Sequence, residues 1–136
     1  MTAKDKVLVG SRKPLAGRRV LILEDEYFLA DEIAGELTAL GAEIVGPFGG
    51  IADADAALKS GTRIDMAVLD VQVRNEMVFP LARALRSRGV PFVFTTGYGR
   101  ASLDAEFQDV ELWQKPLDLA RVLPSLPGLI SQGTSE

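Results

Sequence analysis

The sequence predicts an α/β protein with a doubly wound, five-stranded parallel sheet of order 2-1-3-4-5 and helices on both faces. Three observations support this prediction. Short runs of consecutive apolar residues, typical of strands buried on both faces, recur along the chain. Segments with apolar residues at every third or fourth position lie between these runs. The 136 residues, 47% of them hydrophobic, are enough for one domain with a single core.

The first half of the chain contains two predicted strands and two predicted helices. Residues 20–23, Val-Leu-Ile-Leu, form the first strand. The amphipathic helix after it ends at Gly41, a residue that tolerates the left-handed conformation common after helices. Residues 42–46 are expected to form the second strand. The Gly-Pro-Phe-Gly-Gly sequence 46–50 then turns the chain into a second helix over residues 51–60.

The second half continues the alternation. The apolar run 66–69 predicts the third strand, and the spacing of apolar residues predicts a helix over 78–88. Residues 90–96 form the predicted fourth strand. A short, weak helix is expected near residues 102–107, before a fifth strand over residues 110–114.

The last helix is predicted to be interrupted. It starts near Asp118, but Pro124 and Pro127 lie further along the same segment. A proline inside a helix removes a hydrogen bond and clashes with the preceding turn. We therefore expect a break near Leu123, followed by a separate short turn around residues 125–130.

Polar residues stand where the predicted strands end, namely Glu24, Asp25, Asp70, Thr96 and Lys115. In an open doubly wound sheet, ligands bind outside the carboxyl ends of the strands, at the crevice where the winding direction reverses. The first and third strands flank that crevice, so the three carboxylates are expected to converge. Taken singly, these residues equally suit helix caps and loops, but their coincidence at one end of the sheet favours a functional site.

The residue types limit the chemistry of this site. The chain has no histidine and no cysteine, which excludes imidazole catalysis, thiolate zinc sites and disulfides. Three close carboxylates repel one another unless a cation joins them, and Mg²⁺ prefers oxygen ligands of this kind. Asp70 could then act as a nucleophile toward a phosphoryl group. Lys115 and the hydroxyl of Thr96 would bind the phosphoryl oxygens.

Charge divides the chain into two parts. Residues 1–19 carry six basic groups and one acidic group, whereas residues 20–136 carry nine basic and 18 acidic groups. We therefore expect a basic N-terminal extension over residues 1–17, the domain over 18–131 and a short tail over 132–136. An acidic body argues against nucleic acid as a partner. No run of about 18 apolar residues is present, so we expect no membrane partner and a cytoplasmic protein.

The sequence resembles the receiver domains of two-component response regulators, which have a flavodoxin-like fold, over residues 18–131. The matching segments are Leu-Glu-Asp-Glu at 23–26, Val-Leu-Asp-Val at 68–71, Phe-Thr-Thr-Gly at 94–97 and Gln-Lys-Pro at 114–116. The resemblance implies that Asp70 accepts a phosphoryl group from a phosphohistidine of a sensor histidine kinase. It also implies that Mg²⁺ is held by Glu24, Asp25, Asp70 and the main-chain carbonyl of Gln72, and that Thr96 and Lys115 bind the phosphoryl group.

A narrower resemblance concerns residues 91–98, Pro-Phe-Val-Phe-Thr-Thr-Gly-Tyr. They are similar to the signature of the single-domain "FAT GUY" regulators of alphaproteobacteria, with Thr95 in place of alanine. That group implies a kinase of the HWE or HisKA2 type and an unidentified downstream protein, reached by direct contact, or a role as phosphate sink. Because Pro124 and Pro127 interrupt the usual output face, we expect a monomer or a weak dimer.

The chain also departs from the receiver pattern. Many receivers have a proline four residues after the acceptor, where this chain has Arg74. No glycine lies within residues 71–88, so Asn75 is the candidate for a left-handed residue. The usual aromatic residue of the fifth strand is Leu112 here, and Trp113 should face the opposite side of the sheet. The segment before this strand is short, which predicts a rudimentary or mobile fourth helix.

Two alternatives to a phosphorylated, non-enzymatic receiver remain. A phosphohydrolase of the haloacid-dehalogenase type also uses an aspartate nucleophile and Mg²⁺. However, it needs an acid two residues further on, where this chain has Gln72, which cannot transfer a proton. The other alternative is a degenerate receiver that binds partners without phosphorylation. The glycine-rich sequence 46–50 lacks the lysine of a P-loop and is expected to be a plain turn.

Overall fold

A single five-stranded sheet forms the centre of the molecule. The computed structural model describes the backbone of residues 13–134 and the side chains of residues 13–130. The strands are parallel and lie in the order β2-β1-β3-β6-β7, which confirms the predicted flavodoxin-like topology. Their bounds are β1 (Arg19–Leu23), β2 (Glu43–Phe48), β3 (Met66–Asp70), β6 (Phe92–Thr96) and β7 (Leu112–Gln114). A separate two-stranded hairpin, β4 (Gln72–Val73) and β5 (Glu76–Met77), comes after β3.

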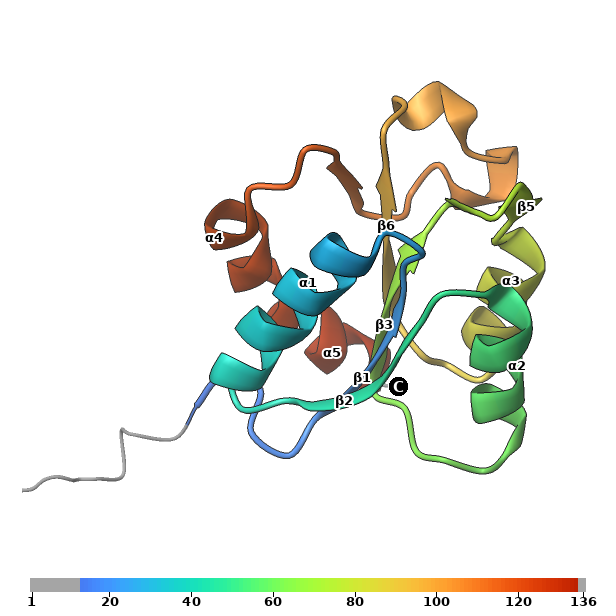
Figure 1. The fold of residues 1–136 in the computed structure, drawn as a ribbon. Coiled ribbons are helices and arrows are strands. Elements are labelled where there is room, and N and C mark those ends of the chain that lie inside the picture. The colour runs from blue at the N-terminus through green and yellow to red at the C-terminus, as the bar shows by residue number, and fades with distance from the viewer. Residues whose placement is uncertain (1–12, 135–136) are drawn as a thin grey trace, which may run out of the picture.

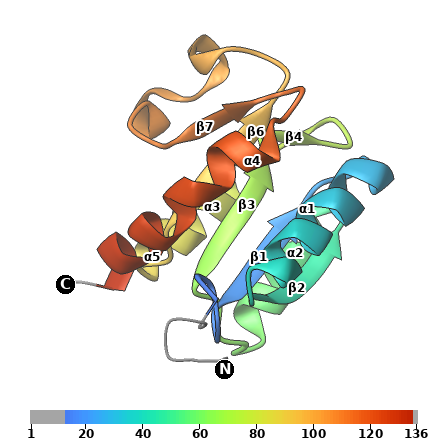
Figure 2. The same cartoon turned by 90° about the vertical axis from the view of Figure 1, so that its left-hand side faces the viewer.

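Helices cover both faces of this sheet (Figures 1 and 2). One face carries α1 (Tyr27–Ala39), α4 (Leu119–Val122) and α5 (Leu126–Thr134), and the other carries α2 (Ile51–Lys59) and α3 (Phe79–Ser87). Each face has its own apolar core, because successive strand residues point to opposite sides. Val20 and Ile22 of β1 join the core beneath α1 and α5, whereas Leu21 and Leu23 join the core beneath α2 and α3.

The second strand is longer than its sequence predicts. We expected the chain to turn from Gly46 onward, but β2 continues to Phe48, whose carbonyl accepts a hydrogen bond from the N–H of Glu24 at 2.9 Å. Gly46 has a φ of 107°, which introduces an irregularity that lets the strand pass through Pro47. Proline is tolerated there because β2 is an edge strand.

The connection between β6 and β7, residues 97–111, contains no α-helix. The helix expected over 102–107 is replaced by two 3₁₀ turns, Arg100–Ser102 and Ala105–Phe107. The ring of Phe107 is fully buried and stacks on Phe79 of α3, with 5.4 Å between the ring centroids. The predicted fourth helix is therefore rudimentary, and an aromatic contact fixes its end to the core.

Arginines of α3 add a second attachment for this connection. Arg83 forms ion pairs with Asp104 at 3.2 Å and with Glu106 at 2.7 Å. Arg86 donates a hydrogen bond to the carbonyl of Glu106, and its guanidinium lies 5.0 Å from the ring centroid of Phe107. The connection is thus held by contacts with a helix about 20 residues earlier in the chain.

The C-terminal segment is broken as predicted, but the chain after the break differs from the prediction. Helix α4 passes into a 3₁₀ turn, Leu123–Ser125, and the nine-residue helix α5 then forms in place of the expected short turn. Leu126 and Ile130 are buried one helical turn apart, which anchors α5 on the sheet. Pro127 occupies the first turn of α5, where its missing N–H has no helical partner to lose.

The single tryptophan faces the side of the sheet that the strand alternation predicts. Trp113 is buried in the core beneath α1 and α5, whereas its neighbour Leu112 packs against the opposite core. The indole N–H donates a hydrogen bond to a carboxylate oxygen of Glu111 at 2.8 Å, and the hydroxyl of Ser125 donates to the same oxygen at 2.7 Å. This network joins β7 to the C-terminal segment.

The ends of the expected domain fall partly outside the described residues. Of the predicted N-terminal extension, residues 1–12 lie outside them; within residues 13–17, Leu15 is fully buried and its N–H donates to the carbonyl of Leu40 at 2.9 Å. Of the predicted tail, residues 135–136 lie outside. Within the described part of the chain, no helix has the length and apolar character needed to cross a membrane.

Candidate functional site

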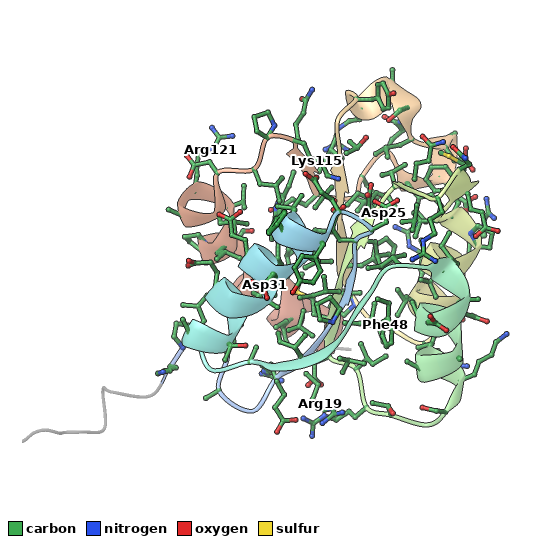
Figure 3. All side chains as sticks on the ribbon, viewed as in Figure 1. Arg19, Asp25, Asp31, Phe48, Lys115 and Arg121 are labelled. Atoms are coloured by element: carbon green, nitrogen blue, oxygen red, sulfur yellow. The ribbon has the colours of Figure 1, made fainter. Side chains whose placement is uncertain are left out.

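The polar residues that end the strands meet at one end of the sheet. Glu24 and Asp25 come directly after β1, Asp70 is the last residue of β3, Thr96 is the last residue of β6 and Lys115 comes directly after β7. The strands hold them in register, since Asp70 pairs with Thr95 and Thr96 pairs with Gln114. Figure 3 shows Asp25 and Lys115 together at this end, opposite Arg19. The expected convergence is therefore observed.

Lys115 lies between two buried carboxylates. Its ammonium nitrogen, Nζ, is 3.0 Å from Oε1 of Glu24 and 3.2 Å from Oδ2 of Asp70. Only 3% of Glu24 and 5% of Asp70 is exposed to solvent. A charge removed from water in this way requires a partner, and the ammonium group supplies one to both acids.

One ammonium group does not balance two buried acids. Burial and the neighbouring charge of Asp70 raise the pKa of Glu24 from its usual 4.5 to about 7. Burial also raises the pKa of Asp70, although the charge and hydrogen bond of Lys115 oppose this shift. Burial alone would lower the pKa of Lys115, but the hydrogen bond to Glu24 and the charge of Asp70 outweigh it and raise that pKa. The site thus carries excess negative charge.

The donor set fits a divalent cation that prefers oxygen. Glu24, Asp25 and Asp70 each offer a carboxylate oxygen, and these oxygens lie within 4.8 Å of one another. The buried Oε1 of Glu24 forms the ion pair with Lys115 but accepts no hydrogen bond of good geometry from the described residues. Mg²⁺ takes carboxylate ligands of this kind and would neutralise the excess charge. The predicted fourth ligand, the main-chain carbonyl of Gln72, stays a prediction, although Gln72 lines the adjacent cavity.

A cavity of about 730 Å³ opens beside Asp70. Its lining consists of Asp25, Asp70, Val71, Gln72, Met77, Thr96, Gly97, Tyr98, Ser102 and Lys115. The hydroxyl oxygen of Thr96 accepts a hydrogen bond from the N–H of Tyr98 at 3.1 Å, so its own proton is available for donation. The cavity therefore brings an acid, an ammonium group and a hydroxyl donor to one space large enough for a small anion.

Asp25 accepts a hydrogen bond from a residue for which the sequence predicts no such role. The N–H of Arg74 donates to Oδ2 of Asp25 at 3.0 Å. Arg74 and Asn75 connect β4 to β5 with φ values of 51° and 68°. Asn75 was the predicted left-handed residue, but Arg74 adopts that conformation too. Two consecutive positive φ values define the type I′ turn of a two-residue hairpin, whose usual signal is Asn-Gly, and Arg-Asn lacks that signal.

Two other lining residues were missed. Ser102 reaches the cavity from an irregular connection, where no strand or helix period exists to place it. Met77 reaches it from the hairpin. Neither position carries a sequence signal, because each depends on how a short segment folds back over the end of the sheet.

Exposed apolar side chains surround the mouth of the site. Among the described residues, the large hydrophobic side chains that remain exposed are Tyr27, Phe28, Met77 and Tyr98. Tyr27 and Phe28, 74% and 82% exposed, begin α1 directly after the acidic residues and meet edge to face. Phe28 also lines a second cavity of about 490 Å³, whose other wall includes Lys115 and Pro116. Exposed apolar groups gathered in this way are typical of a protein-binding surface.

Comparison with known proteins shows to which family this architecture belongs. No family model and no curated protein matches the sequence. Among solved structures, SdrG from Sphingomonas melonis Fr1 is 38% identical, with a TM-score of 0.72, and the match covers 83% of this chain and 96% of SdrG. SdrG from Pseudomonas melonis Fr1, in its BeF3-activated conformation, is 36% identical over 85% and 98% of the two chains, with a TM-score of 0.69.

More distant structures share the fold. A response regulator receiver protein from Sinorhizobium medicae WSM419 is 23% identical, with a TM-score of 0.74 and coverage of 85% of this chain and 96% of that one. The response regulator TrrA from Thermotoga maritima, in complex with Mg²⁺ and BeF, is 20% identical, with a TM-score of 0.71 and coverage of 82% and 98%. The chain belongs to the receiver domains of response regulators, which are signalling proteins.

Proposed function

We propose that this protein is a stand-alone receiver that accepts a phosphoryl group on Asp70 in a Mg²⁺-dependent reaction. One observation supports this most strongly. The buried carboxylate of Asp70 lies within 3.2 Å of Lys115, shares a cation-sized cluster of oxygens with Glu24 and Asp25, and faces a cavity lined by Thr96. The domain proposed for this role spans residues 18–131.

The reaction uses an oxygen of Asp70 as the nucleophile. It attacks the phosphorus of a phosphohistidine on a partner protein, the phosphorus–nitrogen bond breaks, and the electron pair leaves with the imidazole. Lys115 and the hydroxyl proton of Thr96 then bind the phosphoryl oxygens. A histidine donor must come from another chain, because this one has none.

Glu24, Asp25 and Asp70 would hold Mg²⁺, together with the main-chain carbonyl of Gln72. Bound there, Mg²⁺ supplies positive charge against the phosphoryl oxygens. The chain's own contribution is to place two ligands, Glu24 and Asp25, after β1 and the acceptor at the end of β3, because these two strands pair side by side. The relatives crystallised with BeF or studied in a BeF3-activated form support this assignment.

Labelling with a small phosphodonor tests the proposal. Incubation with acetyl phosphate and Mg²⁺ should add one phosphoryl group, measured by mass spectrometry of the intact protein. Asp70→Asn should remove the label, because the amide is not a nucleophile toward phosphorus. Glu24→Ala with Asp25→Ala should also abolish it while leaving the circular dichroism spectrum unchanged. A wild-type protein that is not labelled, even by a cognate kinase, would instead support a degenerate receiver.

We further propose that the phosphodonor is a sensor histidine kinase of the HWE or HisKA2 type. The sequence of residues 91–98, similar to the FAT GUY signature, supports this assignment. The exposed Tyr27 and Phe28, which line cavities with Asp25 and with Lys115, provide a surface for such a partner. The protein would work in the cytoplasm as a monomer or weak dimer, without catalysing a reaction of its own, and would signal through a downstream protein or drain phosphate from the kinase.

Replacement of Phe28 by alanine separates partner binding from chemistry. Because Phe28 is 82% exposed, the change should leave stability and acetyl phosphate labelling unaltered. Phosphotransfer from the kinase should slow about tenfold if the ring contributes as a central contact of the interface. The control is Glu36→Ala, an exposed position near the other end of the same helix. Equal transfer rates for wild type and Phe28→Ala would exclude this surface.

A further inference from the structure

Two glycines after β2 occupy positions whose backbone does not need glycine. Gly50 has a φ of −145° and a ψ of 150°, an extended conformation open to any residue. Gly49 also lies outside the left-handed region. A Cβ atom at Gly49 would meet a guanidinium nitrogen of Arg74 at 3.2 Å, and a Cβ at Gly50 would meet the other at 3.3 Å. The two glycines therefore leave room for the side chain of Arg74.

The backbone of Arg74 is held in a conformation that arginine rarely adopts. Its φ of 51° lies in the left-handed region, where the Cβ of an ordinary L-residue is crowded by the following carbonyl. Within the described residues, the guanidinium makes no hydrogen bond or ion pair. Arg74 is exposed and lines a cavity of about 370 Å³ together with Glu24, Asp25 and Asp31, but its guanidinium forms an ion pair with none of them. Its contact with the two glycines is therefore packing rather than charge pairing.

The main-chain N–H of the same residue reaches the site. It donates the hydrogen bond to Oδ2 of Asp25 and, among the described residues, no other hydrogen bond to that carboxylate is present. Asp25 is solvent-exposed, unlike Glu24 and Asp70, so packing does little to fix its orientation. The position of the β4–β5 hairpin consequently determines where this carboxylate points.

We propose that Arg74 is a positioning residue for the metal site. Its guanidinium, packed on Gly49 and Gly50, fastens the β4–β5 hairpin to the turn before α2 and so keeps the Arg74 N–H on the carboxylate of Asp25. The inference rests on the proposed function, since Asp25 is assigned there as a Mg²⁺ ligand. Groups that orient a metal ligand typically change metal affinity by about tenfold or more.

A purely electrostatic role for Arg74 predicts the opposite outcome. A positive charge near three carboxylates repels Mg²⁺, so its removal would strengthen binding. A positioning role predicts weaker binding after the same change. The sign of the change in Mg²⁺ affinity therefore separates the two roles.

Arg74→Gly is the direct test, because glycine keeps the N–H, accepts the positive φ and removes only the side chain. Mg²⁺ binding is measured by titration calorimetry and by the NMR shift of the residue 74 amide. We expect about tenfold weaker binding with an unchanged melting temperature. Asn75→Gly is the matched control, since it alters the same turn but not the packing on the glycines, and it should bind like wild type. Unchanged or tighter binding by Arg74→Gly would overturn the proposal.

A double-mutant cycle tests the packing on the glycines. Gly49→Val should displace the guanidinium and weaken Mg²⁺ binding as much as Arg74→Gly does. In the Arg74→Gly background, the same valine should have no further effect. Additive losses would show that the two positions act independently and would also overturn the proposal.

Labelling kinetics provide an independent readout. If Arg74 acts only through the metal ligand, Arg74→Gly should raise the Mg²⁺ concentration needed for half-maximal labelling by acetyl phosphate about tenfold. The rate at saturating Mg²⁺ should be unchanged. A wild-type protein that does not bind Mg²⁺ would contradict the proposed function itself, whereas normal binding by both proteins would contradict only the role of Arg74.

Discussion

The acidic site and the β6–β7 connection stand at the same end of the molecule but are built in opposite ways. The site is placed by backbone pairing of buried strands, yet its carboxylates are crowded and their pKa values are raised. The connection has no regular element beyond two 3₁₀ turns, yet side chains fix it firmly, with Phe107 fully buried. The crowded carboxylates that the site needs for its function lower the stability of the folded protein. The irregular β6–β7 connection, in contrast, contributes stability through its buried side chains.

Removal of the Phe107 ring should have the largest effect. Phe107→Ala would leave a cavity among Phe79, Phe92 and Phe94 and lower the free energy of unfolding by about 3–5 kcal/mol, measured by urea denaturation. Phe28→Ala, at an exposed position, should change it by less than about 0.5 kcal/mol. Below its melting temperature, Phe107→Ala should still be labelled on Asp70. Loss of labelling in the folded variant would show that the two regions are not separate.

The pH dependence of stability should reveal the strain in the site. The pKa of Glu24 is about 7 in the folded protein, against its usual 4.5. The folded state therefore holds a proton that the unfolded chain releases above pH 4.5. In the presence of EDTA, the contribution of this group to stability should be complete below pH 4.5 and should be lost as pH rises through 7, by up to about 3 kcal/mol. The raised pKa of Asp70 acts in the same direction.

Glu24→Gln checks the origin of this dependence. The neutral amide should flatten the fall in stability and make the metal-free protein more stable than wild type at pH 7.5. Mg²⁺ should stabilise wild type at that pH but not the variant. A wild-type stability that rises between pH 5 and pH 7.5 in EDTA would contradict our account of the site.

The smallest of these changes in stability is expected at Thr95. This residue lies on β6, the strand that carries Thr96 of the acidic site and leads into the β6–β7 connection. Its hydroxyl oxygen is buried and has no hydrogen-bond partner among the described residues. Thr95→Val keeps the shape and removes the unsatisfied group, so it should raise the free energy of unfolding by about 1 kcal/mol. Thermal denaturation measures this change, with Thr38→Val at an exposed position of α1 as the control. A destabilised Thr95→Val protein would indicate that the hydroxyl is solvated.

Much of the fold and of the site could be predicted because strand ends are local features. The continuous apolar runs placed β1, β3 and β6 to within two residues, since strands buried on both faces tolerate few other residues. Once the strand order was fixed, the residues after those runs had to meet at one edge. Glu24, Asp70 and Lys115 accordingly lie together.

The remaining features depend on contacts between distant residues. Phe107 packs against Phe79, 28 positions earlier, and no hydrophobic periodicity within the connection predicts that contact. The left-handed conformation of Arg74 runs against its propensity and is compatible with the fold because Gly49 and Gly50 make space for its side chain. Similarly, α5 forms despite the nearby prolines because Leu126 and Ile130 pack into the core beneath it.

Because Trp113 is hydrogen-bonded to Glu111, its indole is an intrinsic fluorescence probe. The sequence contains one tryptophan, so the intrinsic indole emission comes from a single position. Emission from an indole beside a carboxylate responds to small changes in the distance and orientation of that charge. Because Trp113 pairs with Thr95, next to Thr96 and two residues before Lys115, fluorescence at one wavelength could follow events at the acidic site in real time without an attached dye.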